Sequence, residues 1–157
     1  MTQTPVPRFE TGRPMLLAGL RARYRFEDMP DKLIAAWKTF VPSLPLPGQV
    51  NDVTYGAMCG TDLAAQTCEY MCAVEVRNFD ALPADCGRMC VPAARYAVFT
   101  HDGPLAGLPQ TWAGVHAWLG SSGEKAAPTP DYERYDDRFD PRTGEGVVEI
   151  WVPILGE

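Results

Sequence analysis

The sequence has no long hydrophobic run and no cluster of basic residues. Its longest mostly apolar stretch, residues 15–20, is far shorter than the roughly 20 residues that a membrane-spanning helix needs. Fourteen Lys and Arg stand against twenty Asp and Glu, a net charge of −6. This balance argues against direct nucleic-acid binding, which needs clustered cations. Because the N-terminus lacks a charged-then-apolar leader, we expect a cytoplasmic protein without a membrane partner.

Signatures of nucleophilic and nucleotide chemistry are also missing. The two histidines, His101 and His116, belong to no G-x-S-x-G or Cys/His signature. The glycines of residues 103–107 form no phosphate-binding pattern and have no lysine beside them. We expect His101 to cap a turn after a strand and His116 to lie on a helix surface. The sequence therefore predicts no cofactor.

The cysteines are few and odd in number, which does not fit a disulfide framework. Two C-x3-C pairs raise the alternative of a zinc site. In a strand, however, residues four apart are separated by about 13 Å, whereas two sulfurs on one zinc ion lie about 4 Å apart. Cys68 and Cys72 fall in CEYMCAVEV, which has strand character. We therefore predict no metal and reduced thiols at Cys59, Cys68, Cys72, Cys86 and Cys90.

What is present is typical of a folded domain. The chain has 157 residues, of which 46% are hydrophobic and 22% are charged, a composition that excludes intrinsic disorder. This length fits one compact domain. We expect a single domain over residues 1–157, with a flexible N-terminus at 1–11.

The predicted elements follow the same order twice. In the first half we expect a helix at 29–40, ended by Pro42, and strands at 14–24, 53–59 and 68–77. Residues 78–87 form a loop. In the second half we expect a strand at 93–101, a turn at 102–104, a helix at 108–119 that Gly120 ends, and strands at 132–135 and 146–154.

The two halves therefore form pseudo-repeats of about 12–78 and 90–155, each a strand–helix–strand–strand module. One module covers a single face of its sheet with its helix and leaves the other face bare. Two modules can bring their bare faces or edges together and leave a hollow, where small-molecule sites tend to lie. The predicted fold class is α+β, with duplicated modules, an antiparallel sheet and a central ligand cleft.

The last strand, residues 146–154, combines an apolar face with an unusual opposite face. Alternation places four aliphatic side chains on one side: Val148, Ile150, Val152 and Ile154. The other side has a carboxylate, Glu149, beside an indole, Trp151. This pair is either a cation-binding wall or an exposed acid on an edge strand with a partly covered tryptophan.

Residues 132–135 have the same character, with Glu133 and Tyr135 on one face. If this strand pairs with the last one, a second carboxylate enters the same cleft. Aromatic faces attract organic cations by about 0.5–2 kcal/mol each, and a carboxylate about 4 Å away adds about 4 kcal/mol at intermediate dielectric. Desolvation opposes both. For further aromatics a core role is the alternative: Tyr55, Tyr70, Tyr96, Phe99, Trp112 and Trp118.

The segments YAVFTHDGPLAGLPQTWAGVHAWLGSSG and PDYERYDDRFDPRTGEGVVEIWVPI resemble the GyrI-like (gyrase-inhibitor-like) effector-binding domain. That domain also occurs in AraC-type and multidrug-responsive transcription regulators. The resemblance implies two modules around a cleft that often takes hydrophobic cations, with Glu133 and Glu149 facing the cleft and Trp151 at an aromatic position. The predicted ligand-binding residues are Glu149, Trp151, Glu133, Tyr135, Tyr55, Phe99 and Trp112.

The sequence departs from the family near Tyr55, where Ala57, Met58 and Cys59 replace the usual paired aromatics. It also lacks a helix-turn-helix segment. The preferred function is a stand-alone module that senses or sequesters a small organic, cationic or amphipathic ligand. One alternative is a hydrolase of toxic cyclopropane-bearing compounds that uses Glu149 or Glu133. The other is a protein-binding inhibitor with an acidic surface at Asp131, Glu133, Asp136, Asp137 and Asp140; no protein partner is named.

Overall fold

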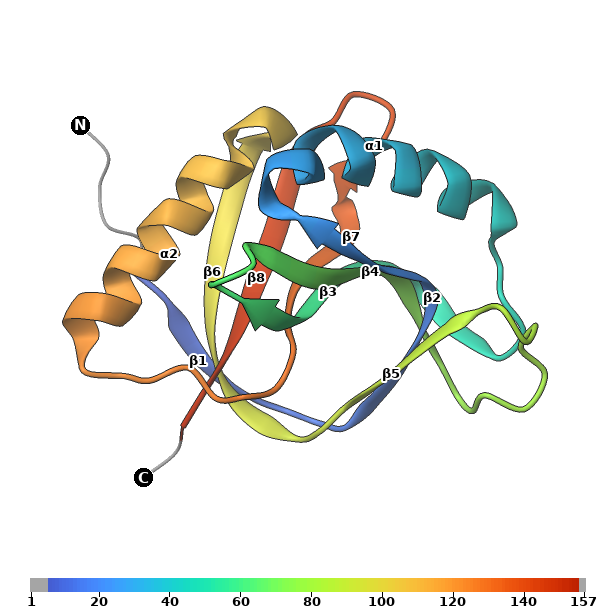
Figure 1. The fold of residues 1–157 in the computed structure, drawn as a ribbon, viewed down its shortest axis with the longest axis horizontal. Coiled ribbons are helices and arrows are strands. Elements are labelled where there is room, and N and C mark those ends of the chain that lie inside the picture. The colour runs from blue at the N-terminus through green and yellow to red at the C-terminus, as the bar shows by residue number, and fades with distance from the viewer. Residues whose placement is uncertain (1–5, 156–157) are drawn as a thin grey trace. The chain divides into compact units, whose positions relative to one another are not determined.

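The computed structural model describes residues 6–155 and divides into two units. The N-terminal unit is residues 14–92, and the C-terminal unit combines the segment before residue 14 with residues 93–155. Each unit has one α-helix and four strands of antiparallel sheet (Figure 1). The α+β prediction is confirmed. In the part of the chain that the structure describes, no helix is long and apolar enough to cross a membrane.

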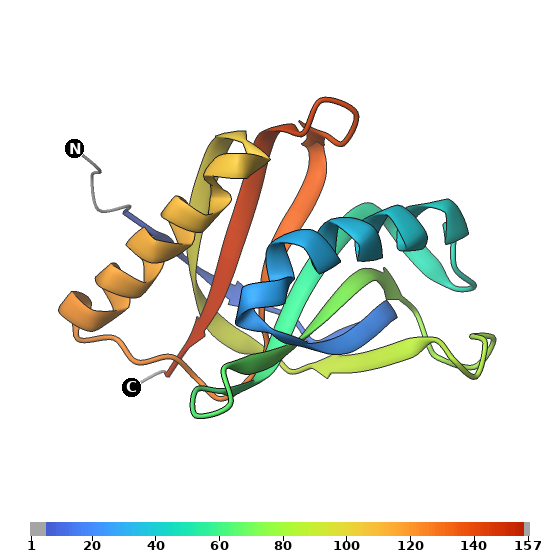
Figure 2. The same cartoon turned by 45° about the horizontal axis from the view of Figure 1, so that its top comes forward.

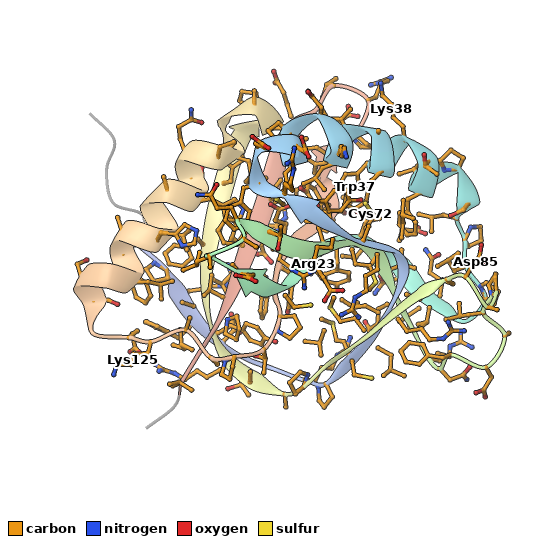
Figure 3. The ribbon with its side chains drawn as sticks, viewed as in Figure 1. Arg23, Trp37, Lys38, Cys72, Asp85 and Lys125 are labelled. Carbon is orange, nitrogen blue, oxygen red and sulfur yellow. The ribbon has the colours of Figure 1, made fainter. Side chains whose placement is uncertain are left out.

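The N-terminal unit packs helix α1 onto a sheet of order β3-β4-β2-β5. Pro30 lies in the first turn of α1, where a missing N–H costs nothing. Cys72 lies in the core of this unit, and Trp37 of α1 packs against that core (Figure 3). The elements are β2 (Met15–Arg25), η1 (Phe26–Asp28), α1 (Met29–Phe40), η2 (Val41–Ser43), β3 (Gln49–Asp62), β4 (Thr67–Val76) and β5 (Gly87–Val91).

The C-terminal unit packs helix α2 along a sheet of order β1-β6-β8-β7 (Figure 2). The aliphatic row predicted for the last strand is confirmed, since Val148, Ile150, Val152 and Ile154 all lie in the core under α2. The elements are β1 (Arg8–Gly12), β6 (Ala94–Pro104), η3 (Leu105–Gly107), α2 (Leu108–Ser122), β7 (Asp131–Asp140) and β8 (Glu145–Ile154).

The two units share one topology. In each, a strand–helix–strand–strand sequence is completed by an extra edge strand beside its first strand, β5 in one unit and β1 in the other. The duplicated modules are therefore confirmed, while the exact repeat bounds stay a prediction. Both extra strands escaped the sequence analysis because each is five residues long and is defined by its partner strand.

Several predicted boundaries are wrong, and three of them bear on the fold. Residues 8–11 of the predicted flexible N-terminus pair with β6 as part of β1, and residues 1–5 of that prediction lie outside the described residues. Residues 102–104 form no turn but continue β6, because Gly103 faces Gly146 and both adopt positive φ. Helix α2 passes Gly120 and ends at Gly123, whose φ of 83° supplies the left-handed cap.

Two of the cysteines lie in a strand, as the sequence predicts. Cys68 and Cys72 both lie in β4, so the strand assignment is confirmed. Both side chains are buried, whereas Cys90 is exposed. Within residues 6–155, no group of three or more His, Cys, Asp or Glu side chains is arranged to hold a metal ion.

Candidate ligand-binding site

Three predicted residues come together in the C-terminal unit, and we call them the Glu133 cluster: Trp112, Glu133 and Tyr135. The Trp112 indole Nε1–H donates to Glu133 Oε2 at 2.8 Å. The Tyr135 hydroxyl donates to the other oxygen, Oε1, also at 2.8 Å. Glu133 is only 7% exposed. The cluster therefore presents a buried, oriented carboxylate between two aromatic side chains.

Local structure explains how these three side chains meet. Glu133 and Tyr135 are two residues apart on β7, so alternation directs them to the same face of the sheet. Tyr135 packs on the core beneath α2, and Trp112 packs on the same core from the helix. Helical spacing places the buried Val115 beside Trp112, which seats this part of α2 on the sheet.

Further rings extend the aromatic surface of the Glu133 cluster. Phe139 meets Tyr135 edge to face, with ring centroids 5.1 Å apart. His116 stacks on Trp112 at 5.7 Å with an interplanar angle of 28°. His116 is exposed on the helix surface, as predicted. The π-face of an indole or a phenol attracts a cation, so the surroundings of Glu133 combine both elements of a cation site.

Glu149 lies on the opposite face of the same sheet. The register pairs Arg134 with Glu149 and Glu133 with Ile150. Directly paired residues share a face, and Ile150 is in the core under α2, so Glu149 points away from α2. The expectation that both acids enter one cleft is wrong, because a difference of one residue in register changes the face that a side chain occupies.

Glu149 is surrounded by arginines. Its carboxylate accepts from Arg8 Nη2 at 2.8 Å and from Trp151 Nε1 at 3.0 Å, and it forms ion pairs with Arg138 at 3.1 Å and Arg134 at 3.5 Å. Burial raises the pKa of Glu149, but the hydrogen bonds from Arg8, Trp151 and Arg138 outweigh it and leave the pKa below its usual range. This acid is neutralised within its own unit.

Asp136 completes the same ion-pair network. It bonds to Arg134 at 2.7 Å and to Arg138 at 2.8 Å. The hydrogen bonds from Arg138 lower the pKa of Asp136 to about 2, against the opposing effect of burial. With Glu133 buried and Asp136 held between two arginines, the acidic residues 131–140 do not form one exposed acidic surface.

The remaining predicted residues, Trp151, Phe99 and Tyr55, pack against other side chains away from the Glu133 cluster. Trp151 stacks on Tyr132 at 5.7 Å and meets Tyr96 edge to face at 5.3 Å, on the Glu149 face of the sheet. Phe99 is fully buried and packs edge to face against Trp118 at 5.3 Å. Tyr55 belongs to the N-terminal unit, where it is 4% exposed on β3. The central cleft stays a prediction.

Asp131 adds a second carboxyl group to the face of Glu133. The two residues lie two apart on β7 and therefore point the same way. Burial, reinforced by the nearby charge of Glu133, raises the pKa of Asp131 to about 7.

A hollow of about 690 Å³ lies at the C-terminal end of α2. Arg95, Glu124 and Lys125 are among its lining residues, and Arg95 and Glu124 lie 3.8 Å apart as an ion pair. Two cations and one acid do not suit a positively charged ligand. Its composition separates it chemically from the Glu133 cluster.

Residues 5–155 match the family model of the GyrI-like small molecule binding domain. The chain belongs to this family. Over 128 residues it is 28% identical to the transcriptional regulator BrlR of Pseudomonas aeruginosa. The aligned segment covers 79% of this chain and 47% of the regulator. The GyrI-like chain thus spans about half the length of that curated relative.

Solved structures support the same fold. SAV2435, in its structure bound to tetraphenylphosphonium, superposes with a TM-score of 0.77 at 19% identity, over 96% of this chain and 94% of that one. The C-terminal domain of EcmrR gives a TM-score of 0.68 at 15% identity, over 99% and 100%. The resemblance stated from the sequence is confirmed, and this GyrI-like domain is related to the effector-binding domains of transcription regulators.

Proposed function

We propose that this GyrI-like domain senses or sequesters hydrophobic organic cations, which bind at the Glu133 cluster. The observation that carries the proposal is the position of the Glu133 carboxylate, held at 2.8 Å by both the Trp112 indole and the Tyr135 hydroxyl. Both donors are neutral, so these two hydrogen bonds orient the carboxylate without cancelling its charge. A cation with aromatic groups fits both the charge and the rings.

The magnitudes favour moderate affinity. A carboxylate about 4 Å from a cation contributes about 4 kcal/mol at an effective dielectric of 20, and each aromatic face contributes about 0.5–2 kcal/mol. Removing both charges from water costs a large part of this. A hydrophobic cation has little hydration to lose, which favours it over a small ammonium ion. We expect micromolar dissociation constants.

Glu149 is the weaker candidate because its charge is already compensated. Arg8, Arg134 and Arg138 all lie within ion-pair distance of its carboxylate. A cationic ligand there would meet three guanidinium groups and would have to displace at least one. We therefore assign to Glu149 a structural role, in which it ties β8 to β1 and β7.

The likeness to SAV2435 supports the choice of ligand class. That protein was solved with tetraphenylphosphonium, a hydrophobic monocation. The same compound is a suitable probe for this chain, because its charge is shielded by four phenyl groups that can pack on indole and phenol rings.

Isothermal titration of the full chain with tetraphenylphosphonium tests the proposal. We expect Glu133→Gln to weaken binding by about tenfold or more, since it removes the charge and keeps the shape. Glu149→Gln is the matched control on the opposite face, and Asp137→Asn is an exposed control on the same strand. Both should stay within about twofold of the wild type, because neither side chain belongs to the proposed site. A thermal melt checks that Glu149→Gln, which leaves three arginines without their buried carboxylate, is still folded. Equal binding by Glu133→Gln and the wild type would rule out this site.

The same cluster favours hydrolysis as a second candidate function. The Tyr135 hydroxyl lies 2.8 Å from the Glu133 carboxylate. In a hydrolysis, Glu133 would take a proton from a water whose oxygen bonds to a ring carbon, while the Tyr135 hydroxyl protonates the carbon released as the ring C–C bond breaks; Glu133 then returns its proton to Tyr135. Incubation of the chain with a cyclopropane-bearing electrophile separates the two functions. Product formation that Glu133→Gln abolishes would indicate an enzyme, whereas binding without product indicates a sensor or sequestering protein.

A further inference from the structure

His101 is a buried histidine that lies outside the proposed ligand site. It sits on β6 and is 7% exposed. Its Nε2 lies 2.9 Å from the Pro104 carbonyl oxygen, and its Nδ1 lies 2.7 Å from the Thr111 hydroxyl. The ring therefore connects the end of β6 to the first turn of α2.

The Pro104 carbonyl fixes which nitrogen of His101 donates. A carbonyl oxygen can only accept, so Nε2 carries the proton and donates to Pro104. When Nδ1 carries no proton, it accepts from the Thr111 hydroxyl, which also lies 3.5 Å from the Gly107 carbonyl oxygen. The contact between His101 and Thr111 therefore needs the hydroxyl group. Valine at residue 111 has a similar shape but cannot form this hydrogen bond.

The His101 side chain lies against the start of α2. Within the described residues, the N-cap Gly107 of α2 offers no side-chain hydrogen bond. Gly107 also lies against the imidazole, because a Cβ atom there would come within 3.3 Å of His101 Cε1. The imidazole thus packs into the turn between β6 and α2.

Thr111 and Trp112 are consecutive residues of α2, and consecutive side chains point about 100° apart around a helix. Thr111 is held by His101 on β6, whereas Trp112 is held by Glu133 on β7. Two anchors in different directions fix the rotation of the helix about its axis. Losing the Thr111 anchor would let the indole of Trp112 move relative to the Glu133 carboxylate.

We propose that His101 and Thr111 are positioning residues for the ligand site. They hold the Trp112 indole in position beside Glu133 and do not contact the ligand themselves. This inference rests on the proposed function, because it assigns a role within that same site. It predicts that affinity depends on the hydroxyl of residue 111, which contacts His101 on β6 and not Glu133 on β7.

The test compares Thr111→Val, which removes the hydroxyl, with Thr111→Ser, which keeps it. Ala117→Gly, an exposed change in the same helix, serves as the control for helix stability. Each full-length variant is examined by thermal melting, by tetraphenylphosphonium titration and by the indole N–H resonances of ¹⁵N-labelled protein. Trp112→Phe assigns the Trp112 signal among the four tryptophans.

We expect Thr111→Val to weaken tetraphenylphosphonium binding by about five- to tenfold and to move the Trp112 indole resonance, while Thr111→Ser changes neither. Ala117→Gly should lower the melting temperature with both readouts unchanged. The inference is overturned if Thr111→Val leaves the resonance and the affinity as in the wild type, or if Ala117→Gly changes them equally. A shifted resonance in a protein whose wild type binds no probe would support the positioning role and refute the proposed ligand.

Discussion

Two buried glutamates of the C-terminal unit differ in their neighbours at the scale of single residues. Glu133 accepts hydrogen bonds from an indole and a phenol, whereas Glu149 lies among three arginines. Alternation along each strand predicts that an acid stands beside aromatic side chains, and this much was visible in the sequence. Arg8, 141 residues away from Glu149 in the chain, could not be assigned to it without the pairing of β1.

Asp131 provides a pH prediction at the same scale. Its pKa is raised to about 7 in the folded state, against about 3.9 in an unfolded chain. The folded state therefore holds the proton more strongly, so the stability contribution is complete below about pH 4 and is lost as the pH rises through about 7. Asp131→Asn removes this loss.

Thermal melts at pH 5 and pH 8 measure the effect. We expect the wild type to lose at least about 3 °C more than Asp131→Asn between these two values. Asp137→Asn, an exposed change in the same strand, should keep the wild-type slope. Parallel slopes for wild type and Asp131→Asn would show that Asp131 is ionised throughout this range.

At the scale of elements, periodicity predicted where helices and strands lie better than where they end. The predicted bounds of α1, 29–40, are confirmed. They could be predicted because Pro30 and Pro42 lie at the two ends of the helix's apolar pattern. For α2 the sequence has two glycines near the expected end, Gly120 and Gly123, and the prediction places the end at Gly120. Gly120 continues the helix, while Gly123 adopts the left-handed conformation that ends it.

This boundary can be tested by a pair of alanine variants. Gly120→Ala should stabilise the protein by about 0.5–1 kcal/mol, because it adds a helix-favouring residue inside α2 where a Cβ meets nothing within 4 Å. Gly123→Ala should destabilise it by a similar amount, since its φ of 83° disfavours a side chain. Chemical denaturation measures both. The opposite signs would place the end of α2 at Gly120.

At the scale of the whole molecule, two units of identical strand order carry different polar groups beneath their helices. In the N-terminal unit the Trp37 indole of α1 donates to the Tyr70 hydroxyl at 3.1 Å. In the C-terminal unit the Trp112 indole of α2 donates to the Glu133 carboxylate. The repeated element order was predicted from the sequence, but this difference in charge was not, because it depends on tertiary contacts between helix and sheet.

A crystal structure of the chain with tetraphenylphosphonium would show directly whether the cation binds at the Glu133 cluster. We expect the phosphorus atom to lie next to the Glu133 carboxylate, with a phenyl group packed on the indole of Trp112. The phosphorus atom should lie within about 6 Å of the centre of that indole ring. A complex in which the cation instead contacts Glu149, after displacing its arginines, or lies in the hollow at the end of α2 would contradict it.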